Sequence, residues 1–335
     1  MNTEEIKSKL ETFEYDFLRR DENLGKNIIL LTLGGSYAYG TNTDSSDLDV
    51  RGIAVERVSN IIGLTSFQQF EDKETDTVIY GLKKIIKLLL NCNPNTIEML
   101  GTKDEHVFVC NKYGKELRNN IDIFLSKKAI QSFGGYASQQ LRRLQNSLVR
   151  DNYPSYEKEE HILNSINNQI ATMNDRYQFF DDNNLKLYVD TSKRDSMTEE
   201  IYMDINFKHY PLRDFKNIYS EMSNVVRSYD KLTHRNNKKD SAHMYKHAMH
   251  LIRLLNMGTE ILEGKGVNTY READHEILMD IRNGYYSYEE IFEMVDKYVQ
   301  QFDYASKNTV LNDNPDIEAT NQLLIDIYKD VILNA

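Results

Sequence analysis

The stretch LTLGGSYAYGTNTDSSDLDVRG, residues 31–52, joins an apolar run to a glycine turn and then to two aspartates. The apolar run, 27–33, is continuous and short, which is typical of a buried strand. Gly34 and Gly35 let the backbone turn tightly and approach a ligand. Ser36 opens a predicted short helix, whose free N–H groups suit an anion. The stretch therefore predicts a strand that ends in a phosphate-binding turn.

Asp47 and Asp49 lie at the start of a second strand, predicted over 48–55. Alternate residues of a strand point to one face, so the two carboxylates repel each other unless a cation lies between them. Such oxygen ligands suit Mg²⁺, which binds through a few carboxylates plus substrate phosphates. A phosphate-binding turn that faces paired carboxylates is typical of nucleotidyl transfer by two metal ions.

The rest of the chain predicts an α+β fold. Before residue 105 we expect a helix over 3–19, a third strand over 75–80, and helices over 82–90 and 96–100. Beyond it the pattern is mostly helical, with a small β insertion at about 181–211. The predicted helices there span 114–125, 127–150, 156–178, 212–233, 241–264, 272–283, 287–305 and 316–333.

Composition excludes several classes of protein. The 335 residues carry a formal net charge of −11, so non-specific binding to duplex DNA or to an anionic membrane is unfavourable. Two cysteines, Cys92 and Cys110, do not make a disulfide framework, and we expect no disulfide-linked partner. No apolar run is long enough to span a membrane, and no signal peptide is visible, so a cytoplasmic location is expected.

Gly35-Ser36 followed by Asp47-Leu48-Asp49 resembles the signature of the polymerase β-like nucleotidyltransferase superfamily. GSYAYGTNTDSSDLDVRGI and DTVIYGLKKIIKLLLNCNPNTIEML are similar to the predicted nucleotidyltransferases encoded beside RNA ligases, and a weaker likeness continues through YKHAMHLIRLL. The resemblance implies a minimal nucleotidyltransferase mixed sheet with flanking helices at 1–105. A mostly helical domain at 106–335 would complete the nucleotide site.

The resemblance also implies a third carboxylate on a later strand. By position and strand phase we choose Asp76, with Asp72 and Glu74 as alternatives in the same acidic stretch. Asp47, Asp49 and Asp76 are then the predicted catalytic residues and the ligands of Mg²⁺ or Mn²⁺. Another acid to which the resemblance draws attention, Glu98, is expected to be structural or to support the site.

A basic helix face forms the second candidate cluster. At about 100° per residue, roughly a third of the circumference carries His243, Lys246, His247, His250 and Arg253. This face holds a triphosphate, binds RNA phosphates, or is simply solvated. The resemblance supports Lys246, His250 and Arg253 as nucleotide-binding residues, beside Gly35 and Ser36.

Other residues leave alternatives open. Arg51 follows the aspartates on the same face, where it either neutralises a phosphate or pairs with a carboxylate. Arg271 and Arg282 join the site or form surface salt bridges. For Tyr136 and Gln139, contact with a base is the alternative to a structural role, which the sequence favours.

These features predict transfer of a nucleoside monophosphate from an NTP to an acceptor hydroxyl. An RNA end, such as that of a tRNA in repair or modification, fits the resemblance and the basic stretch. A small-molecule or protein acceptor fits the acidic net charge better. A non-catalytic, antitoxin-like nucleotide-binding module is the third alternative, and intact carboxylates argue against it.

Overall fold

The computed structural model describes residues 1–152 and 241–334 and, between them, 185–193, 199–206 and several isolated positions. The chain divides into two compact units, Met1–Leu141 with Tyr245–Ala335, and Arg142–Met244. Residue 105, the predicted domain boundary, lies within the first unit, and the two-domain division stays a prediction. The helices predicted over 156–178 and 212–233 fall largely outside the described residues.

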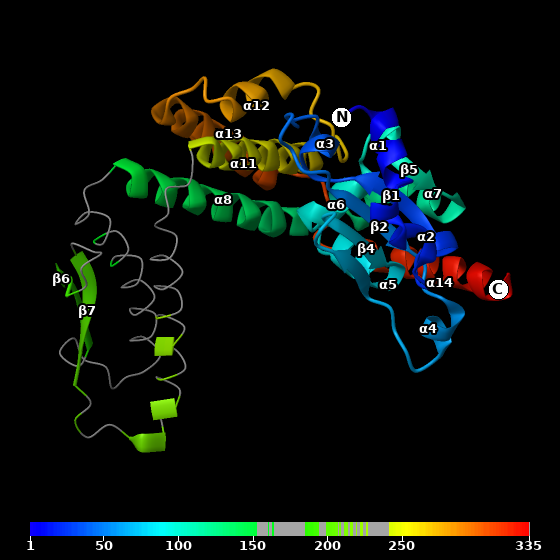
Figure 1. Ribbon diagram of the computed structural model, residues 1–335, viewed down its shortest axis with the longest axis horizontal. Helices are drawn as coiled ribbons and strands as arrows, with labels where there is room; N and C mark the ends of the chain where they lie inside the picture. The colour runs from blue at the N-terminus through cyan, green and yellow to red at the C-terminus, as the bar shows by residue number, and fades with distance from the viewer. Residues whose placement is uncertain are drawn as a thin grey trace. The chain divides into compact units, whose positions relative to one another are not determined.

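A mixed five-stranded sheet organises the first unit (Figure 1), in the order β3-β4-β2-β1-β5. Its strands are β1 (Ile28–Leu33), β2 (Val50–Ala54), β3 (Gln69–Asp72), β4 (Thr77–Gly81) and β5 (Val107–Cys110). β1 pairs antiparallel with β2 and with β5, β2 pairs parallel with β4, and β3 pairs antiparallel with β4. The three predicted strands are therefore the central ones, and two short edge strands were not predicted.

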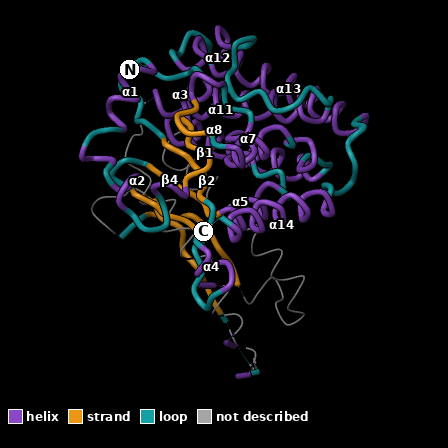
Figure 2. Tube along the Cα trace, turned by 90° about the vertical axis from the view of Figure 1, so that its right-hand side faces the viewer, coloured by secondary structure: helices purple, strands orange, loops and turns teal. Residues whose placement is uncertain are grey.

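Helices flank this sheet and then make up most of the first unit (Figure 2). In the N-terminal part they are α1 (Thr3–Leu10), α2 (Phe17–Arg20), α3 (Gly35–Tyr39), α4 (Val58–Ile62), α5 (Leu82–Leu89), α6 (Pro94–Leu100) and α7 (Lys112–Asn119). They continue with α8 (Lys128–Asn152), α11 (Ser241–Leu262), α12 (His275–Arg282), α13 (Tyr288–Asn308) and α14 (Ile317–Leu333). The predicted α+β class is confirmed, with a mixed sheet first and a helical region after it.

The predicted helix over 3–19 is wrong. α1 ends at Leu10, and a short 3-10 turn, Phe13–Tyr15, separates it from α2. Arg19 closes this bend by donating to the carbonyl of Leu10 at 2.8 Å and to that of Thr12 at 3.0 Å. The bend lets apolar side chains from both short helices reach the same core.

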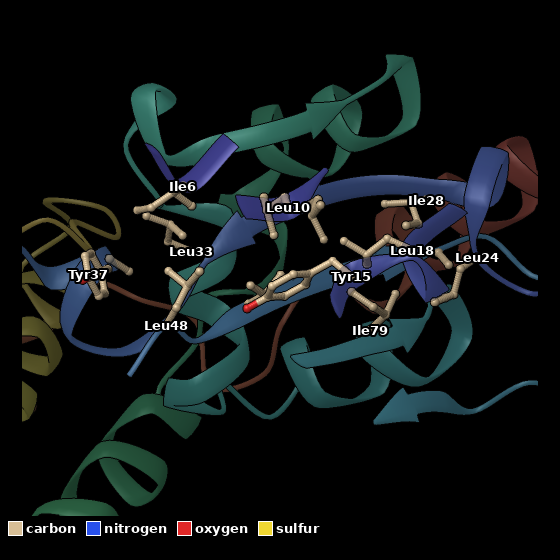
Figure 3. Packing of buried hydrophobic residues seen from close by; sticks show 14 of the residues in the cluster. Ile6, Leu10, Tyr15, Leu18, Leu24, Ile28, Leu33, Tyr37, Leu48 and Ile79 are labelled. Atoms are coloured by element: carbon tan, nitrogen blue, oxygen red, sulfur yellow. The ribbon is translucent and has the colours of Figure 1, made fainter. Parts of the chain in front are cut away.

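The hydrophobic core lies against one face of the sheet (Figure 3). Ile6 and Leu10 of α1 and Leu18 of α2 pack with Leu33 of β1 and Ile79 of β4. Burial of these side chains helps to fix the sheet. Because successive residues of a strand point to opposite faces, Arg51 of β2, next to the buried Val50, points to the other face of the sheet, where it is half-buried.

α11 is a central helix of the first unit and lies beside α8 (Figure 1). His247 Nδ1 is 2.9 Å from Gln140 Oε1 of α8. A Cβ on Gly258 would lie 3.1 Å from Cβ of Phe133, so the two helices touch closely there. No helix among the described residues is both long and apolar enough to cross a bilayer.

The second unit contains the predicted β insertion. β6 (Leu185–Thr191) and β7 (Glu199–Ile205) pair antiparallel in register from Leu185 with Ile205 to Thr191 with Glu199. The strand-like alternation of these two segments was the sequence signal, and it is confirmed.

Candidate functional site

The glycine turn after β1 supports the Asp49 side chain directly. The Gly34 amide donates to the carbonyl of Asp49 at 2.9 Å. Gly35 has φ of +54°, and a Cβ placed there would lie 2.0 Å from Asp49 Oδ2. Only glycine fits this position, because any side chain would both strain the backbone and displace the carboxylate. The two halves of the sequence motif therefore meet at one point.

Parallel pairing of β2 with β4 brings Asp76 to the same point. The Val50 amide donates to the carbonyl of Asp76 at 3.2 Å, and Val50 is in register with Thr77. Arg51 Nη2 then lies 2.9 Å from Asp49 Oδ1 and 3.1 Å from Asp76 Oδ1. One guanidinium thus bridges the two carboxylates. This geometry matches the carboxylate-pairing alternative for Arg51.

The electrostatics of Asp49 follow from this arrangement. Burial, with the nearby Asp76 charge, raises the pKa of Asp49 to about 6, although Arg51 and Lys246 oppose the shift. Two carboxylates held this close need a positive charge between them to remain ionised together. Arg51 supplies such a charge, and Lys246 of α11 adds to it from a separate element.

Asp47 lies in the loop just before β2, which begins at Val50 rather than at the predicted residue 48. The Asp47 side chain is exposed, Leu48 after it is buried, and Asp49 is half-buried. Ser36 is buried in α3, and its carbonyl accepts from the Thr41 amide at 2.9 Å.

The basic face of α11 divides into two environments. Lys246 is exposed and acts electrostatically on Asp49. His250 is half-buried, with its ring edge-on to Tyr39 at 6.2 Å between centroids. Burial, with the positive charges of Arg253 and Lys246, holds the pKa of His250 well below its ordinary value, so the imidazole is neutral at pH 7.

Arg253 lies within the protein interior, at 4% exposure. Its Nη1 is 3.3 Å from Glu98 Oε2, and its guanidinium carbon is 3.6 Å from the centroid of the Tyr39 ring. The Tyr39 hydroxyl donates to Glu98 Oε1 at 2.8 Å. These three side chains join α11 and α6 to the end of α3. Arg253 is therefore buried against Tyr39 and Glu98, and its predicted contact with a nucleotide stays a prediction.

Arg271 and Arg282 also meet α3 and the loop after it. The Arg271 amide donates to the Tyr39 carbonyl at 3.0 Å, while its buried guanidinium pairs with Glu260 and Asp274. Arg282 Nη2 donates to Ser46 Oγ at 3.1 Å. Sequence reasoning missed the hydroxyl-bearing loop that receives Arg282. The polar residues between Ser36 and Asp47 were the only sequence pattern that pointed to this loop.

The base-contact candidates lie on α8. The Tyr136 hydroxyl accepts from the side-chain amides of Asn93 at 3.4 Å and Asn95 at 3.5 Å. Gln139 is exposed on the same helix. The contacts of Tyr136 fit the structural role that the sequence favours, and contact with a base stays untested.

The donor set is chemically suited to a hard divalent cation. Asp49 and Asp76 converge on a cationic group, and the exposed Asp47 lies two residues before Asp49. Within the described residues, no three His, Cys, Asp or Glu side chains are grouped closely enough to hold an ion by themselves. Mg²⁺ commonly keeps several waters and takes one or two carboxylates plus substrate phosphates, which this geometry can supply.

Comparison with known proteins identifies the N-terminal segment. Residues 3–163 match the RNA repair pathway DNA polymerase beta family. No curated protein gives a significant match. A crystal structure of a nucleotidyltransferase-like protein from Exiguobacterium sibiricum 255-15 aligns over 97% of this chain and 80% of that one, at 10% identity and a TM-score of 0.25, and this weak likeness carries no argument about function.

The matched segment contains the glycine turn, the bridging arginine and all three predicted carboxylates. It also contains the whole five-stranded sheet. Sequence motif, family match and site geometry thus coincide on the same residues. For residues 3–163, a little under half of the chain, the match supports a polymerase β-like nucleotidyltransferase.

Proposed function

We propose that this protein transfers a nucleoside monophosphate from an NTP to a hydroxyl at an RNA end, with Mg²⁺ or Mn²⁺ held by Asp47, Asp49 and Asp76. The convergence of Asp49 and Asp76 on Arg51, directly against the glycine turn, carries the proposal. A bound divalent ion supplies charge neutralisation for the triphosphate and lowers the pKa of the acceptor hydroxyl.

Residues of the chain itself would bind the phosphates and the acceptor hydroxyl. The backbone amides of Gly35 and Ser36 bind phosphate oxygens at the turn, where no Cβ blocks the approach. Lys246 of α11, whose charge acts on Asp49, stabilises negative charge that develops on the phosphates. Asp76 is 54% exposed, so an acceptor hydroxyl can reach its carboxylate.

Arg51 changes partner in this proposal. Without an ion, its guanidinium neutralises Asp49 and Asp76. Were a divalent ion held by Asp49 and Asp76, the Arg51 guanidinium would be free to pair with a phosphate oxygen, for which its planar fork is well suited. Both alternatives considered for Arg51 thus apply, one to each state of the site.

The proposed acceptor is supported by the description of the matched family, an RNA repair pathway. The acidic chain gives no general attraction for RNA, so the acceptor end must be held by local positive charge, such as that of the exposed Lys246 of α11. A small-molecule or protein acceptor remains the competing outcome.

The test supplies purified protein with Mg²⁺ and each α-labelled NTP in turn. One set of reactions contains total cellular RNA, and a second contains an extract freed of RNA. Label that enters RNA and is lost in Asp47→Asn/Asp49→Asn supports the proposal and identifies the nucleotide. Label only in the RNA-free extract refutes the RNA acceptor. NTP binding without transfer to either pool refutes catalysis and favours a binding module.

A further inference from the structure

Arg282 reaches from the end of α12 into the loop that joins the two halves of the motif. This loop, residues 40–46, starts after α3 and leads directly into Asp47. Arg282 Nη1 donates to the carbonyl of Thr41, and Nη2 lies 3.1 Å from Ser46 Oγ and 3.5 Å from Thr43 Oγ1. One guanidinium therefore contacts both ends of the loop.

The loop closes around these contacts. The Thr43 amide donates to Ser46 Oγ at 2.8 Å, and the Ser46 amide donates to the carbonyl of Thr43 at 3.0 Å. Thr41 is fully buried and its amide donates to Ser36 in α3. Because Ser46 precedes Asp47, the position of the Asp47 carboxylate depends on this turn.

Arg282 has little other function in the fold. Among the described residues it forms no ion pair, and its named hydrogen bonds all go to loop oxygens. Burial alone lowers its pKa, as expected of a cation without an acidic partner. A half-buried arginine kept without a carboxylate costs desolvation energy, so a compensating role is expected. It also lies outside residues 3–163, the segment that matches the family.

We propose that Arg282 is a positioning residue that fixes the 40–46 loop and thereby holds Asp47 in place to bind the divalent ion. The inference rests on the proposed function, since it assumes an ion at Asp47, Asp49 and Asp76. It assigns to α12 a part in a site whose ligands all come from the N-terminal sheet.

Whether the loss of Arg282 weakens or tightens cation binding distinguishes a positioning role from a purely electrostatic one. Arg282 carries a positive charge close to the ion site. If charge were its whole contribution, its removal would relieve repulsion and tighten binding of a cation. If it positions Asp47, its removal weakens binding, and loss of a residue that supports metal ligands typically costs about 10- to 100-fold in affinity.

The experiment measures Mn²⁺ affinity of the full chain by electron paramagnetic resonance, without nucleotide. The variants are Arg282→Met and Arg282→Lys, which keeps the charge but lacks the fork. Arg19→Met is the matched control, because the Arg19 guanidinium also closes a turn through carbonyl oxygens, and its hydrogen bonds among the described residues go to residues 10–16. Asp49→Asn tests the ion site itself, and thermal melting establishes that each variant is folded.

We expect both Arg282 variants to bind Mn²⁺ about tenfold or more weakly, and Arg19→Met to bind like the wild type. Unchanged or tighter binding by Arg282→Met, with binding lost in Asp49→Asn, overturns the positioning role and leaves the proposed function standing. An equal loss in Arg19→Met also overturns it, because the effect is then general destabilisation. If the wild type binds no Mn²⁺, or Asp49→Asn binds it equally well, the proposed ion site and this inference both fail.

Discussion

Substitution of Gly35 by alanine perturbs the point at which the two motif halves touch. The added Cβ would lie 2.0 Å from Oδ2 and 2.6 Å from Cγ of Asp49. The first distance is about 1.4 Å inside ordinary van der Waals contact, so the carboxylate must move by a comparable amount. The φ of +54° adds strain that glycine does not have.

Both effects have a definite size. An L-residue in left-handed conformation costs roughly 1–2 kcal/mol, which should appear as reduced stability. Misplacement of a catalytic group by about 1 Å costs about 100-fold in rate. We therefore expect Gly35→Ala to remain folded, to lose about 1–2 kcal/mol of unfolding free energy, and to lose nucleotidyl transfer by about 100-fold or more.

Urea unfolding and initial rates of label transfer measure the two effects separately. Gly135→Ala is the matched control, because Gly135 lies in α8 with no atom within 4 Å of an added Cβ. Alanine in a helix interior should stabilise by about 0.5–1 kcal/mol and leave the rate unchanged. A Gly35→Ala variant with wild-type activity would refute the contact between the turn and Asp49 as a feature of the active enzyme.

Three further predictions concern charge. Burial and the Asp76 charge raise the pKa of Asp49 from 3.8 to about 6, so the folded state binds this proton more tightly than the unfolded state does. In EDTA, the wild type should therefore lose stability relative to Asp49→Asn as pH rises from about 4 to about 6. A difference in melting temperature between the two proteins that does not change with pH would contradict this. Arg51→Met should lower the melting temperature of the metal-free protein, because Asp49 and Asp76 lose their counter-charge. Added Mg²⁺ should restore the melting temperature of this variant. If scanning fluorimetry shows no recovery with Mg²⁺, Asp49 and Asp76 do not share an ion site. Glu98→Gln and Arg253→Met should each lower the free energy of unfolding by about 3 kcal/mol or more, because each leaves a buried charge unpaired. The double variant should lose clearly less than the sum of the two single losses. Additive losses in urea unfolding would exclude the coupling between the two side chains.

The central strands and the motif were predictable because their signals are local. The apolar run before Gly34 specifies β1, and the alternation around Val50 and Thr77 specifies two more strands. β3 and β5 were missed for a physical reason. Each has four residues, and edge strands of that length depend on pairing with a distant partner rather than on their own pattern.

The convergence of the carboxylates was predictable only in part. Alternation placed Asp47 and Asp49 on one face, and strand phase selected Asp76. The bridging position of Arg51 depends on the parallel register of β2 with β4, in which Arg51 lies opposite Val78. Register is a tertiary property, so both alternatives for Arg51 fitted the sequence equally well.

The helical wheel of α11 placed Arg253 and Lys246 on one basic face, but the structure separates their environments. Arg253 is buried because Glu98, 155 positions away in sequence, neutralises it. Periodicity treats every arginine as a solvated charge and cannot identify such a partner. The contacts of Arg282 with the loop at residue 46 were hidden for the same reason.

The most direct test of the proposed chemistry compares the fate of two labels in one NTP. With RNA as acceptor, label at the α-phosphate should enter RNA, while label at the γ-phosphate should leave as pyrophosphate. Asp49→Asn should abolish both events, and Asp44→Asn, which removes an exposed carboxylate from the loop at residues 40–46, should leave them intact. Transfer of the γ-label to RNA, or undiminished α-label transfer by Asp49→Asn, would contradict nucleotidyl transfer at this site.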